Sequence, residues 1–427
     1  MIGLRFATVY PQVSAGTRAR EAKVQDIYRT TDEGYLEFSP EFFQHCMREH
    51  LDDPGLTVVS ARYLAEVGVT ATTRMKYNAS GDKSGGRLCG LFHYEIGYRS
   101  RGEARTAEIL VKSKTHYREL VQRLADVLAK GGIDVPDVAG LLAQTELYNT
   151  HMKEINVFRM QKSMPALTQV LPGIYGTYAD DESERFVALE EFLTDAYVMQ
   201  DYRDLMYWTR DRIAQCVRDF AAMHAAFYAN TDALVAEGWL GKTLDAATMT
   251  KLTPLWTAYA DKLRHFEGGL FDAAYLGRHR EWIRTLPEWW GRIDALPKTL
   301  IYNDAQIRNL AVRNGAGPRR LVLFDWECAS IQLPQRDIVE FLSYAIGEGI
   351  TDVDIVNFLE EARAELARLG RREIDRRAWL EGCRLSIQDL HVNRMACQLV
   401  LHITLERPDI ERVFRASMRI LGLLEAM

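Results

Sequence analysis

The stretch IYNDAQIRNLAVRNGAGPRRLVLFDWE, residues 301–327, combines two strand-like apolar runs with polar residues at their edges. Asp304 and Asn309 precede the first run, and Asp325 ends the second. The glycine-rich segment NGAGP between the runs is typical of a tight turn. The pattern therefore predicts a hairpin with acids and an amide gathered at its open end.

The expected pairing brings the polar residues close together. Residues 310–313 should fold back antiparallel on residues 320–324. Counting outward from the turn places Asn309 opposite roughly Leu323, within two residues of Asp325. One open end of the hairpin would then carry all three polar side chains.

Carboxylate and amide oxygens at a loop edge are ligands that suit Mg²⁺, which also keeps water or phosphate oxygens. Asp304, Asn309 and Asp325 together therefore predict a magnesium site. The alternative is ordinary turn capping by Asp304 and Asn309, because short polar side chains often bond to nearby backbone.

Bulk composition limits the classes of protein. The chain has 427 residues, 47% of them hydrophobic and 26% charged. A single core stops growing at roughly 250–300 residues, so two lobes or domains are expected. The net charge of −6 gives no basic excess, which argues against a nucleic-acid binder.

The six cysteines are scattered without a C-x-x-C pair and are expected to be reduced thiols. No apolar run approaches the roughly 18 residues that span a bilayer. The first 16 residues hold one Arg and a broken apolar stretch, unlike a signal peptide. We expect a cytoplasmic protein without a membrane partner.

The expected secondary structure changes along the chain. Residues 1–55 are hard to interpret apart from a helical pattern around PEFFQHCMREHL, and are expected to be an extension. Residues 56–192 contain several strand-like segments and one or two helices, which predicts a five-stranded antiparallel sheet. Residues 193–427 are nearly all helical in pattern, interrupted by the hairpin at 301–327.

The spacing D-x4-N, followed by a hairpin and a second Asp, resembles the kinase catalytic loop H-R-D-x-x-x-x-N and its later D-F-G. The residues YND…N…FDWE are similar to the corresponding motifs of the aminoglycoside phosphotransferase and choline kinase family. The resemblance extends from about residue 56 onward. It implies an α+β, bilobal protein-kinase-like fold with an antiparallel N-lobe sheet and a mainly helical C-lobe.

The resemblance also implies roles for the hairpin residues. Asp304 would orient or deprotonate the acceptor hydroxyl, while Asn309 and Asp325 would hold Mg²⁺. Two positions depart from the family: Tyr302 stands where His is usual, and Gln306 stands where relatives carry Lys, His or another polar residue. The first leaves the metal chemistry intact, and the second leaves the acceptor type open.

A kinase-like N-lobe also needs a strand lysine for the phosphates and a helix glutamate to hold it. Lys112 in ILVKSK is the expected lysine, with Lys114 the less favoured choice, and Glu154 in HMKEINVFR is the expected glutamate. A surface lysine and a solvated helix face are the alternatives.

The remaining nucleotide contacts are expected from two further segments. Backbone groups near Glu191 and Phe192, in FVALEEF, would meet the adenine ring. Gly68 begins a segment whose amides would cover the phosphates, although no G-x-G-x-x-G is present.

Four further features lie outside this set. Asp337 is expected to brace the catalytic loop, and His224 to be a hydrogen-bonded core histidine. The aromatic segment 202–208 could line an acceptor pocket or join helices. The C-terminal helices carrying Asp389 and His391 are where the family usually builds its acceptor site.

The sequence therefore predicts an ATP- or GTP-dependent, Mg²⁺-requiring phosphotransferase acting on a hydroxyl of a small molecule, such as an antibiotic, amino alcohol or similar metabolite. One alternative is a kinase for Ser or Thr of a peptide in a natural-product pathway. A second is a pseudokinase that binds nucleotide or a partner without turnover.

Overall fold

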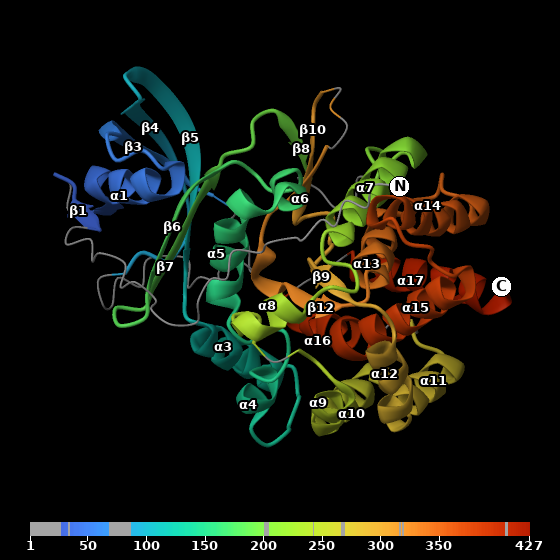
Figure 1. The fold of residues 1–427 in the computed structure, drawn as a ribbon. Helices are drawn as coiled ribbons and strands as arrows, with labels where there is room; N and C mark the ends of the chain where they lie inside the picture. The colour runs from blue at the N-terminus through green and yellow to red at the C-terminus, as the bar shows by residue number, and fades with distance from the viewer. Residues whose placement is uncertain are drawn as a thin grey trace, which may run out of the picture.

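The computed structural model describes residues 27–32, 35–67, 87–199, 205–241, 243–265, 270–315, 317, 320–405 and 409–427. Its N-terminal part is built on an antiparallel sheet and its C-terminal part is mainly helical (Figure 1). The predicted α+β class is confirmed. Within these ranges, no helix combines the length and the apolar character needed to cross a bilayer.

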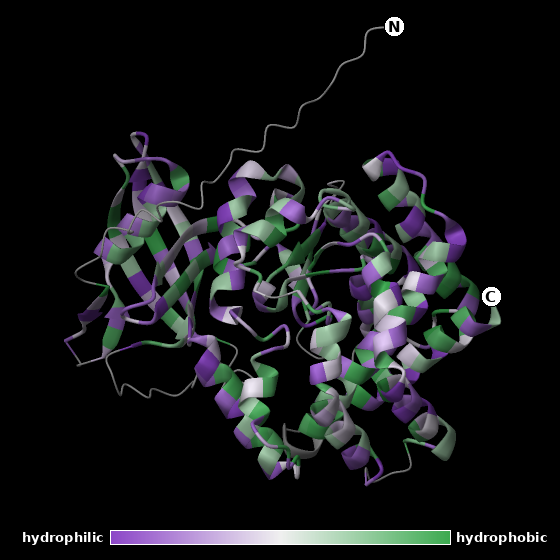
Figure 2. Ribbon diagram, turned by 60° about the horizontal axis from the view of Figure 1, so that its bottom comes forward, coloured by the Kyte–Doolittle hydropathy of each residue, from purple (hydrophilic) through white to green (hydrophobic). Residues whose placement is uncertain are grey.

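The N-terminal sheet has five antiparallel strands, as predicted, and their order in the structure is β3-β4-β5-β7-β6. Buried and more exposed residues alternate along β4, which is the two-residue period of a sheet with one face on a core. Figure 2 shows hydrophilic and hydrophobic residues interspersed along the strands of this sheet. The sequence analysis did not identify β6, whose segment IYGTYAD contains an interrupting glycine. The strands are β3 (Thr57–Glu66), β4 (Gly90–Ser100), β5 (Glu103–Lys114), β6 (Ile174–Asp180) and β7 (Arg185–Glu191).

The described part of the N-terminal extension packs on one face of this sheet. It forms a small hairpin, β1 (Tyr28–Thr30) and β2 (Leu36–Phe38), and the predicted helix α1 (Pro40–Leu51). Ser39 caps α1 by accepting the N–H of Phe42 at 3.0 Å. The Phe42 and Tyr178 rings meet edge to face at 5.6 Å, so α1 and the sheet share one aromatic core.

Of the helices between β5 and β6, α5 and α6 lie between the sheet and the C-terminal part, and α3 and α4 lie below them in Figure 1. The longest, α3, buries leucines at four-residue spacing, as its sequence predicts. The elements are α3 (Tyr117–Lys130), α4 (Val138–Leu142), α5 (Thr150–Met160), η1 (Gln161–Ser163) and α6 (Pro165–Thr168).

The C-terminal part shares one large apolar core, which continues into α3 to α6. Its helices are α7 (Arg210–Ala225), α8 (Asp232–Glu237), α9 (Ala246–Lys251), α10 (Thr253–Leu263), α11 (Ala273–Arg284), α12 (Leu286–Ala295), α13 (Gln335–Ala345), α14 (Asp352–Gly370), α15 (Arg376–Asp389), α16 (Ala396–Leu405) and α17 (Ile410–Ala426). A π-helical turn, η3 (Leu390–Met395), joins α15 to α16.

The predicted hairpin is present as β10 (Leu310–Arg313) and β11 (Leu321–Leu323). Leu310 pairs with Leu323, so Asn309 lies one position further out than expected and faces Phe324, whose N–H donates to the Asn309 carbonyl at 3.3 Å. This shift moves Asn309 closer to Asp325.

Three short strands support the hairpin. The sequence analysis did not identify β8 (Ala196–Val198), which pairs with β10 because the chain leaving β7 runs directly past it. Behind the hairpin, β9 (Thr299–Ile301) pairs with β12 (Ser330–Gln332), and a 3-10 turn, η2 (Trp326–Cys328), precedes β12. Gly68, the expected phosphate contact, lies outside the described residues.

Candidate active site

Two lysines of β5 share one buried glutamate. Lys112 and Lys114 lie two residues apart, so their side chains leave the same face of the strand. Lys112 Nζ lies 3.1 Å from Oε1 of Glu154, and Lys114 Nζ lies 2.8 Å from Oε2. Glu154 comes from α5 and is fully buried. The expected lysine–glutamate pair therefore forms, and the less favoured lysine takes part in it.

This glutamate also reaches the hairpin. Its Oε1 accepts the backbone N–H of Trp326 at 3.1 Å, directly after Asp325. Lys114 Nζ lies 3.8 Å from Asp325 and 3.6 Å from Glu327. Residues about 170 positions apart are thus held in one charged cluster.

The charges in this cluster depend on one another. Burial raises the pKa of Glu154, but the two ammonium groups outweigh it, so its pKa lies below the usual range. Burial lowers the pKa of Lys114, and Glu154, Glu327 and Asp325 more than compensate, so its pKa is raised. Both groups are therefore charged at neutral pH, where each stabilises the other.

Asp304 sits at the centre of a hydrogen-bonded loop and is buried. Its Oδ2 accepts from the Asn309 amide at 2.7 Å, and its Oδ1 accepts from Arg394 at 3.0 Å and from Gln306 at 2.5 Å. The Gln306 carbonyl in turn accepts from Arg308 at 2.8 Å. The carboxylate is thereby fixed in one orientation.

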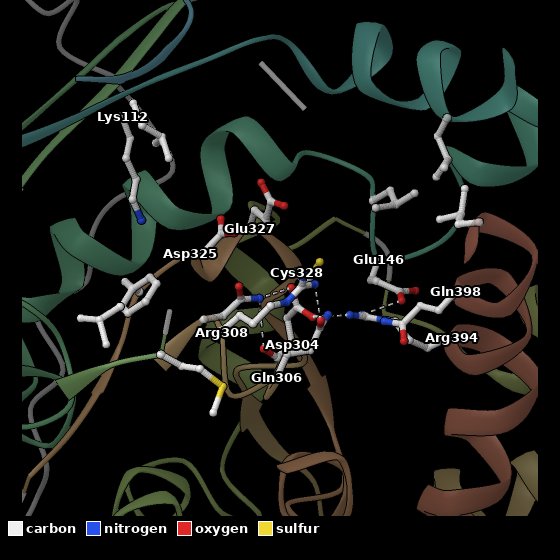
Figure 3. A pocket seen from close by; sticks show the side chains of 18 of the residues that line it. Lys112, Glu146, Asp304, Gln306, Arg308, Asp325, Glu327, Cys328, Arg394 and Gln398 are labelled. Carbon is white, nitrogen blue, oxygen red and sulfur yellow. Dashed lines mark hydrogen bonds and ion pairs between the residues drawn. The ribbon is translucent and has the colours of Figure 1, made fainter. Parts of the chain in front are cut away.

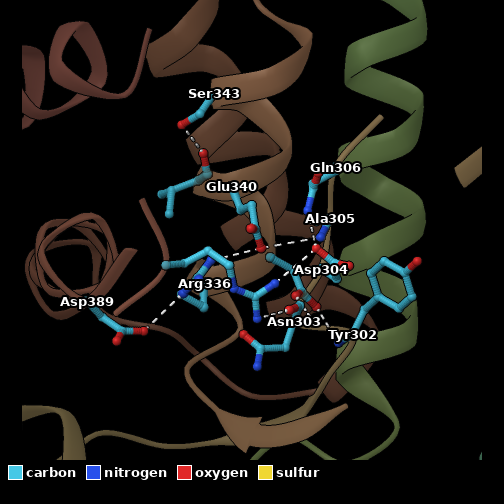
Figure 4. Close-up of polar contacts among 12 residues, drawn as sticks. Tyr302, Asn303, Asp304, Ala305, Gln306, Arg336, Glu340, Ser343 and Asp389 are labelled. Atoms are coloured by element: carbon cyan, nitrogen blue, oxygen red, sulfur yellow. Dashed lines mark hydrogen bonds and ion pairs between the residues drawn. The ribbon is translucent and has the colours of Figure 1, made fainter. Parts of the chain in front are cut away.

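Side chains of α13 hold the backbone of this loop (Figure 4). Asp337 accepts the N–H groups of Tyr302 at 2.8 Å and Asn303 at 2.7 Å, and also bonds His224 at 2.8 Å. Asp337 and His224 are both buried, which matches the bracing and core roles expected of them.

A second brace lies beside the first. Glu340 accepts the N–H of Ala305 at 3.3 Å and pairs with Arg336 at 3.0 Å. Arg336 also bonds Asp389 at 3.0 Å, as Figure 4 shows. Asp389 therefore belongs to the support of the loop.

Tyr302 has a structural role in the hairpin. Its hydroxyl donates to the Asn309 carbonyl at 2.8 Å and also contacts the Phe324 carbonyl, which ties the two arms of the hairpin together. Its neighbour Asn303 has φ 58° and Asp325 has φ 75°, values that L-residues seldom adopt. Such strain is typical of functional loops that the surrounding structure holds in place.

The backbone N–H groups at the end of β7 are paired within the sheet. The N–H of Glu191 donates to Gly173 at 2.7 Å and that of Phe192 to Glu108 at 3.0 Å, so both amides belong to the sheet. The Glu191 side chain pairs with Arg313 of β10 at 2.6 Å. These two N–H groups are therefore occupied, and contact of other backbone groups near Glu191 and Phe192 with an adenine ring stays a prediction.

One cavity of about 1110 Å³ joins these groups. Figure 3 shows Lys112 at one end and Arg394 with Gln398 at the other, with Asp325 and Asp304 between them. The end near Lys112 is lined by residues of β4, β5, β7 and β8. That lining consists of Leu91, Leu110, Lys112, Glu190, Glu191, Ala196, Tyr197 and Val198, with the adjoining Val67, Phe192, Leu193 and Met199.

The sequence analysis missed five charged residues among those described in the lining of this cavity: Glu146, Glu190, Arg308, Glu327 and Arg394. Glu190 is buried and pairs with Lys112 at 3.0 Å. Arg394, from η3, bonds Asp304, the Asn303 carbonyl at 2.8 Å and Glu146 at 2.9 Å. No spacing in the sequence signals an ion pair between residues 146 and 394, whereas Glu190 could have been found from the adjacent acids in a buried strand.

Two residues of the C-terminal helices do not line the cavity. Asp389 faces Arg336, and His391 is buried between the Tyr275 hydroxyl at 3.0 Å and Ser417 at 2.9 Å. The cavity is reached one helical turn later, at Asn393, Arg394, Cys397 and Gln398.

The donor set fits a magnesium ion that shares its coordination with phosphate. Among the described residues, no cluster of three or more His, Cys, Asp or Glu side chains could hold a metal. Asp325 supplies one carboxylate, and the Asn309 amide nitrogen faces Asp304, which turns its amide oxygen away from that acid. Mg²⁺ normally keeps several water or phosphate ligands, so one carboxylate and one amide suffice.

Glu190 predicts a pH dependence of stability. Burial raises the pKa of Glu190 to about 7, more than Lys112 lowers it. Because the pKa of Glu190 is raised in the folded state, its contribution to the free energy of unfolding is complete below the ordinary pKa of 4.5. This contribution is lost as the pH rises through 7. Glu190→Gln cannot ionise, so its melting temperature should fall less than that of the parent between about pH 5 and 8.

Glu191→Gln is the matched control for this melting series. Burial raises the pKa of Glu191, but Arg313 and the Gly173 N–H lower it below the ordinary value overall. Glu191 is therefore ionised throughout this pH range, and its replacement should give a constant offset. Parallel curves for Glu190→Gln and the parent would contradict the proposed titration.

Comparisons with known proteins find similarity only at the level of structure. Neither protein-family models nor curated proteins match the sequence. A choline kinase from Streptococcus pneumoniae is 11% identical, with 87% of this chain and 94% of that chain covered and a TM-score of 0.42. An ethanolamine kinase from Plasmodium vivax is 12% identical, with 78% of each chain covered and a TM-score of 0.40. A GDP complex of an aminoglycoside 2'-phosphotransferase is 11% identical, with 89% and 97% covered and a TM-score of 0.42. Similarity this remote assigns no activity.

Proposed function

We propose that this protein is a phosphotransferase that moves the γ-phosphoryl group of Mg²⁺·ATP or Mg²⁺·GTP to a hydroxyl of a small molecule. The observation that carries the proposal is the convergence, in one cavity, of a lysine–glutamate cluster with Asp304, Asn309 and Asp325. Strand lysine, helix glutamate, loop Asp-x4-Asn and a following Asp are the working parts of a protein-kinase-like site.

In this proposal the chain is divided as the sequence suggests. Residues 56–192 form the N-lobe, residues 193–427 form the C-lobe with the catalytic hairpin 301–327, and residues 1–55 form an extension that packs on the N-lobe. The nucleotide lies between the lobes, with its base against the β7–β8 connection near Leu193 and its phosphates against Lys112. Gly68 stays a predicted phosphate contact, and a cytoplasmic location stays a prediction.

The reaction is an in-line displacement. The acceptor oxygen forms a bond to the γ-phosphorus as the bond to the β–γ bridging oxygen breaks, and the nucleoside diphosphate leaves with that electron pair. Asp304 orients the acceptor hydroxyl and takes its proton, which then passes to solvent. Lys112 neutralises phosphate charge, and Lys114 keeps Glu154 and Asp325 in place. Asn309 and Asp325 would hold Mg²⁺, which supplies further positive charge to the phosphates.

The proposal predicts metal-dependent nucleotide binding. Mg²⁺·ATP or Mg²⁺·GTP should raise the melting temperature, because a ligand at 100 times its Kd stabilises the folded state by about 2.7 kcal/mol. Asp325→Ala should lose most of the magnesium-dependent part of the shift. Asp352→Ala is the control, because Asp352 pairs with Arg419 at the surface. Equal shifts with and without Mg²⁺ in the parent would contradict the metal assignment.

Turnover is tested by ATP consumption with a panel of acceptors: aminoglycosides, macrolides, nucleosides, amino alcohols and Ser/Thr peptides. Nucleotide binding without consumption of ATP by any acceptor would favour the pseudokinase alternative.

A further inference from the structure

The end of the cavity beyond Asp304 differs in character from the nucleotide end. It is lined by residues of α3, α4, the α4–α5 connection, α10, η3 and α16. Figure 3 shows Glu146, Arg394 and Gln398 together at this end. Its described lining consists of Leu124, Leu142, Thr145, Glu146, Leu147, Trp256, Tyr259, Cys328, Asn393, Arg394, Cys397, Gln398 and Leu401. Most of these side chains are apolar or aromatic.

The acid at this end of the cavity already has a cationic partner. Among the described lining residues listed above, Glu146 is the one carboxylate, and it accepts from Arg394 at 2.9 Å and from Asn393 at 3.3 Å. Arg394 also bonds Asp304, so a row of alternating charge runs from Glu146 to the candidate base. Glu146 and Asp304 are both buried, and neither can leave Arg394 without exposing its buried charge.

Three further polar side chains of this lining are neutral and hydrogen-bonded within the protein. Gln398 accepts from the Tyr344 hydroxyl at 2.8 Å through Oε1, which turns its amide NH₂ away from Tyr344. The Thr145 hydroxyl donates to the Leu142 carbonyl at 2.7 Å. The Trp256 ring nitrogen donates to the Met249 carbonyl at 3.3 Å, so its polar edge is satisfied within the protein.

We infer that the acceptor is an uncharged molecule that presents a hydroxyl on an apolar body. The inference rests on the proposed phosphotransferase function and specifies the substrate class of that site. An ammonium group in this end of the cavity would lose its hydrating water. The carboxylate of Glu146 already pairs with Arg394, so the free energy of desolvation would be only partly offset. An apolar body would instead contact the leucine and aromatic side chains while its hydroxyl lies at Asp304.

A matched pair of probes tests this inference. Phenylalaninol and N-acetylphenylalaninol share an aromatic body and a hydroxyl, but only the first carries an ammonium group at neutral pH. With saturating Mg²⁺·ATP analogue, calorimetry should show that the acetylated probe binds at least about tenfold more tightly. Phosphate transfer with Mg²⁺·ATP should follow the same order, and kanamycin and choline should be poor acceptors.

Gln398→Glu places a carboxylate of the same size in this lining. The variant should shift the ratio of the two affinities towards phenylalaninol, whereas Gln398→Met, which adds no charge, should keep the preference for the neutral probe. An unchanged ratio in Gln398→Glu would count against the inference.

The outcomes separate the inference from the proposed function. Equal or tighter binding of phenylalaninol, or no binding of the acetylated probe, overturns the inference even if ATP is consumed with another acceptor. Absence of Mg²⁺·ATP binding overturns the proposed function itself. Faster transfer to a blocked, uncharged serine peptide than to N-acetylphenylalaninol supports the inference and identifies the apolar acceptor as part of a peptide.

Discussion

Replacing Asp304 with asparagine is expected to lower kcat by about 10²–10⁴-fold, the usual contribution of a positioned proton acceptor. The variant keeps the size of the side chain and one acceptor oxygen but cannot take the proton of the acceptor hydroxyl. Apparent nucleotide affinity should change little, because in the proposed mechanism Asp304 acts on the acceptor.

The surroundings of Asp304 indicate that this variant should fold. Arg394 keeps its bonds to Glu146 and to the Asn303 carbonyl, so its charge stays paired. The loop backbone keeps the bonds that Asp337 accepts from it.

The measurement is phosphate transfer to an acceptor found in the panel, alongside nucleotide binding by calorimetry. Asp53→Asn is the matched control, because Asp53 is also a hydrogen-bonded acid but lies in the N-terminal part, where it accepts from Ser100 at 2.7 Å. It should turn over at the parental rate. A near-parental rate for Asp304→Asn would falsify the assignment of Asp304 as the proton acceptor.

The largest effect on stability is expected at Glu154. Glu154→Ala leaves two buried ammonium groups without their shared carboxylate and removes the acceptor of the Trp326 N–H. Breaking a buried ion pair by removing one partner typically costs about 3–5 kcal/mol. We therefore expect the free energy of unfolding to fall by that amount, measured by urea denaturation of the apo protein.

Glu119→Ala is the control for this measurement. Glu119 also pairs with two cations, Arg87 at 3.2 Å and Arg123 at 3.0 Å, but at the surface. Exposed pairs contribute about 0–1 kcal/mol, so this variant should stay close to the parent. Similar losses for the two variants would show that burial does not set the strength of the Glu154 cluster.

Much of the fold could be predicted from local sequence. The alternation in β4 and β5 and the leucine spacing in α3 identify their elements, because each pattern reports which face of a strand or helix is buried. β8 was not foreseen, because three half-buried residues carry too little periodicity to be distinguished from a loop.

Part of the candidate site could also be predicted from local sequence, and part could not. Asp304, Asn309 and Asp325 could be grouped from sequence, because a hairpin brings together residues near each other in the chain. The structure decided that Lys114 joins Lys112 at Glu154, since a two-residue period places both lysines on one face and cannot rank them.

Contacts between distant segments came from the tertiary structure alone. Arg394 bonds Asp304 and Glu146, residues 90 and 248 positions away, and no local pattern encodes such a pairing. Local sequence by itself determined which side chains surround the candidate base within the hairpin. Only the packing of η3 and α16 against the α4–α5 connection decided that the cavity beyond it has a largely apolar lining in which Glu146 pairs with Arg394, because burial and charge pairing depend on which helices meet.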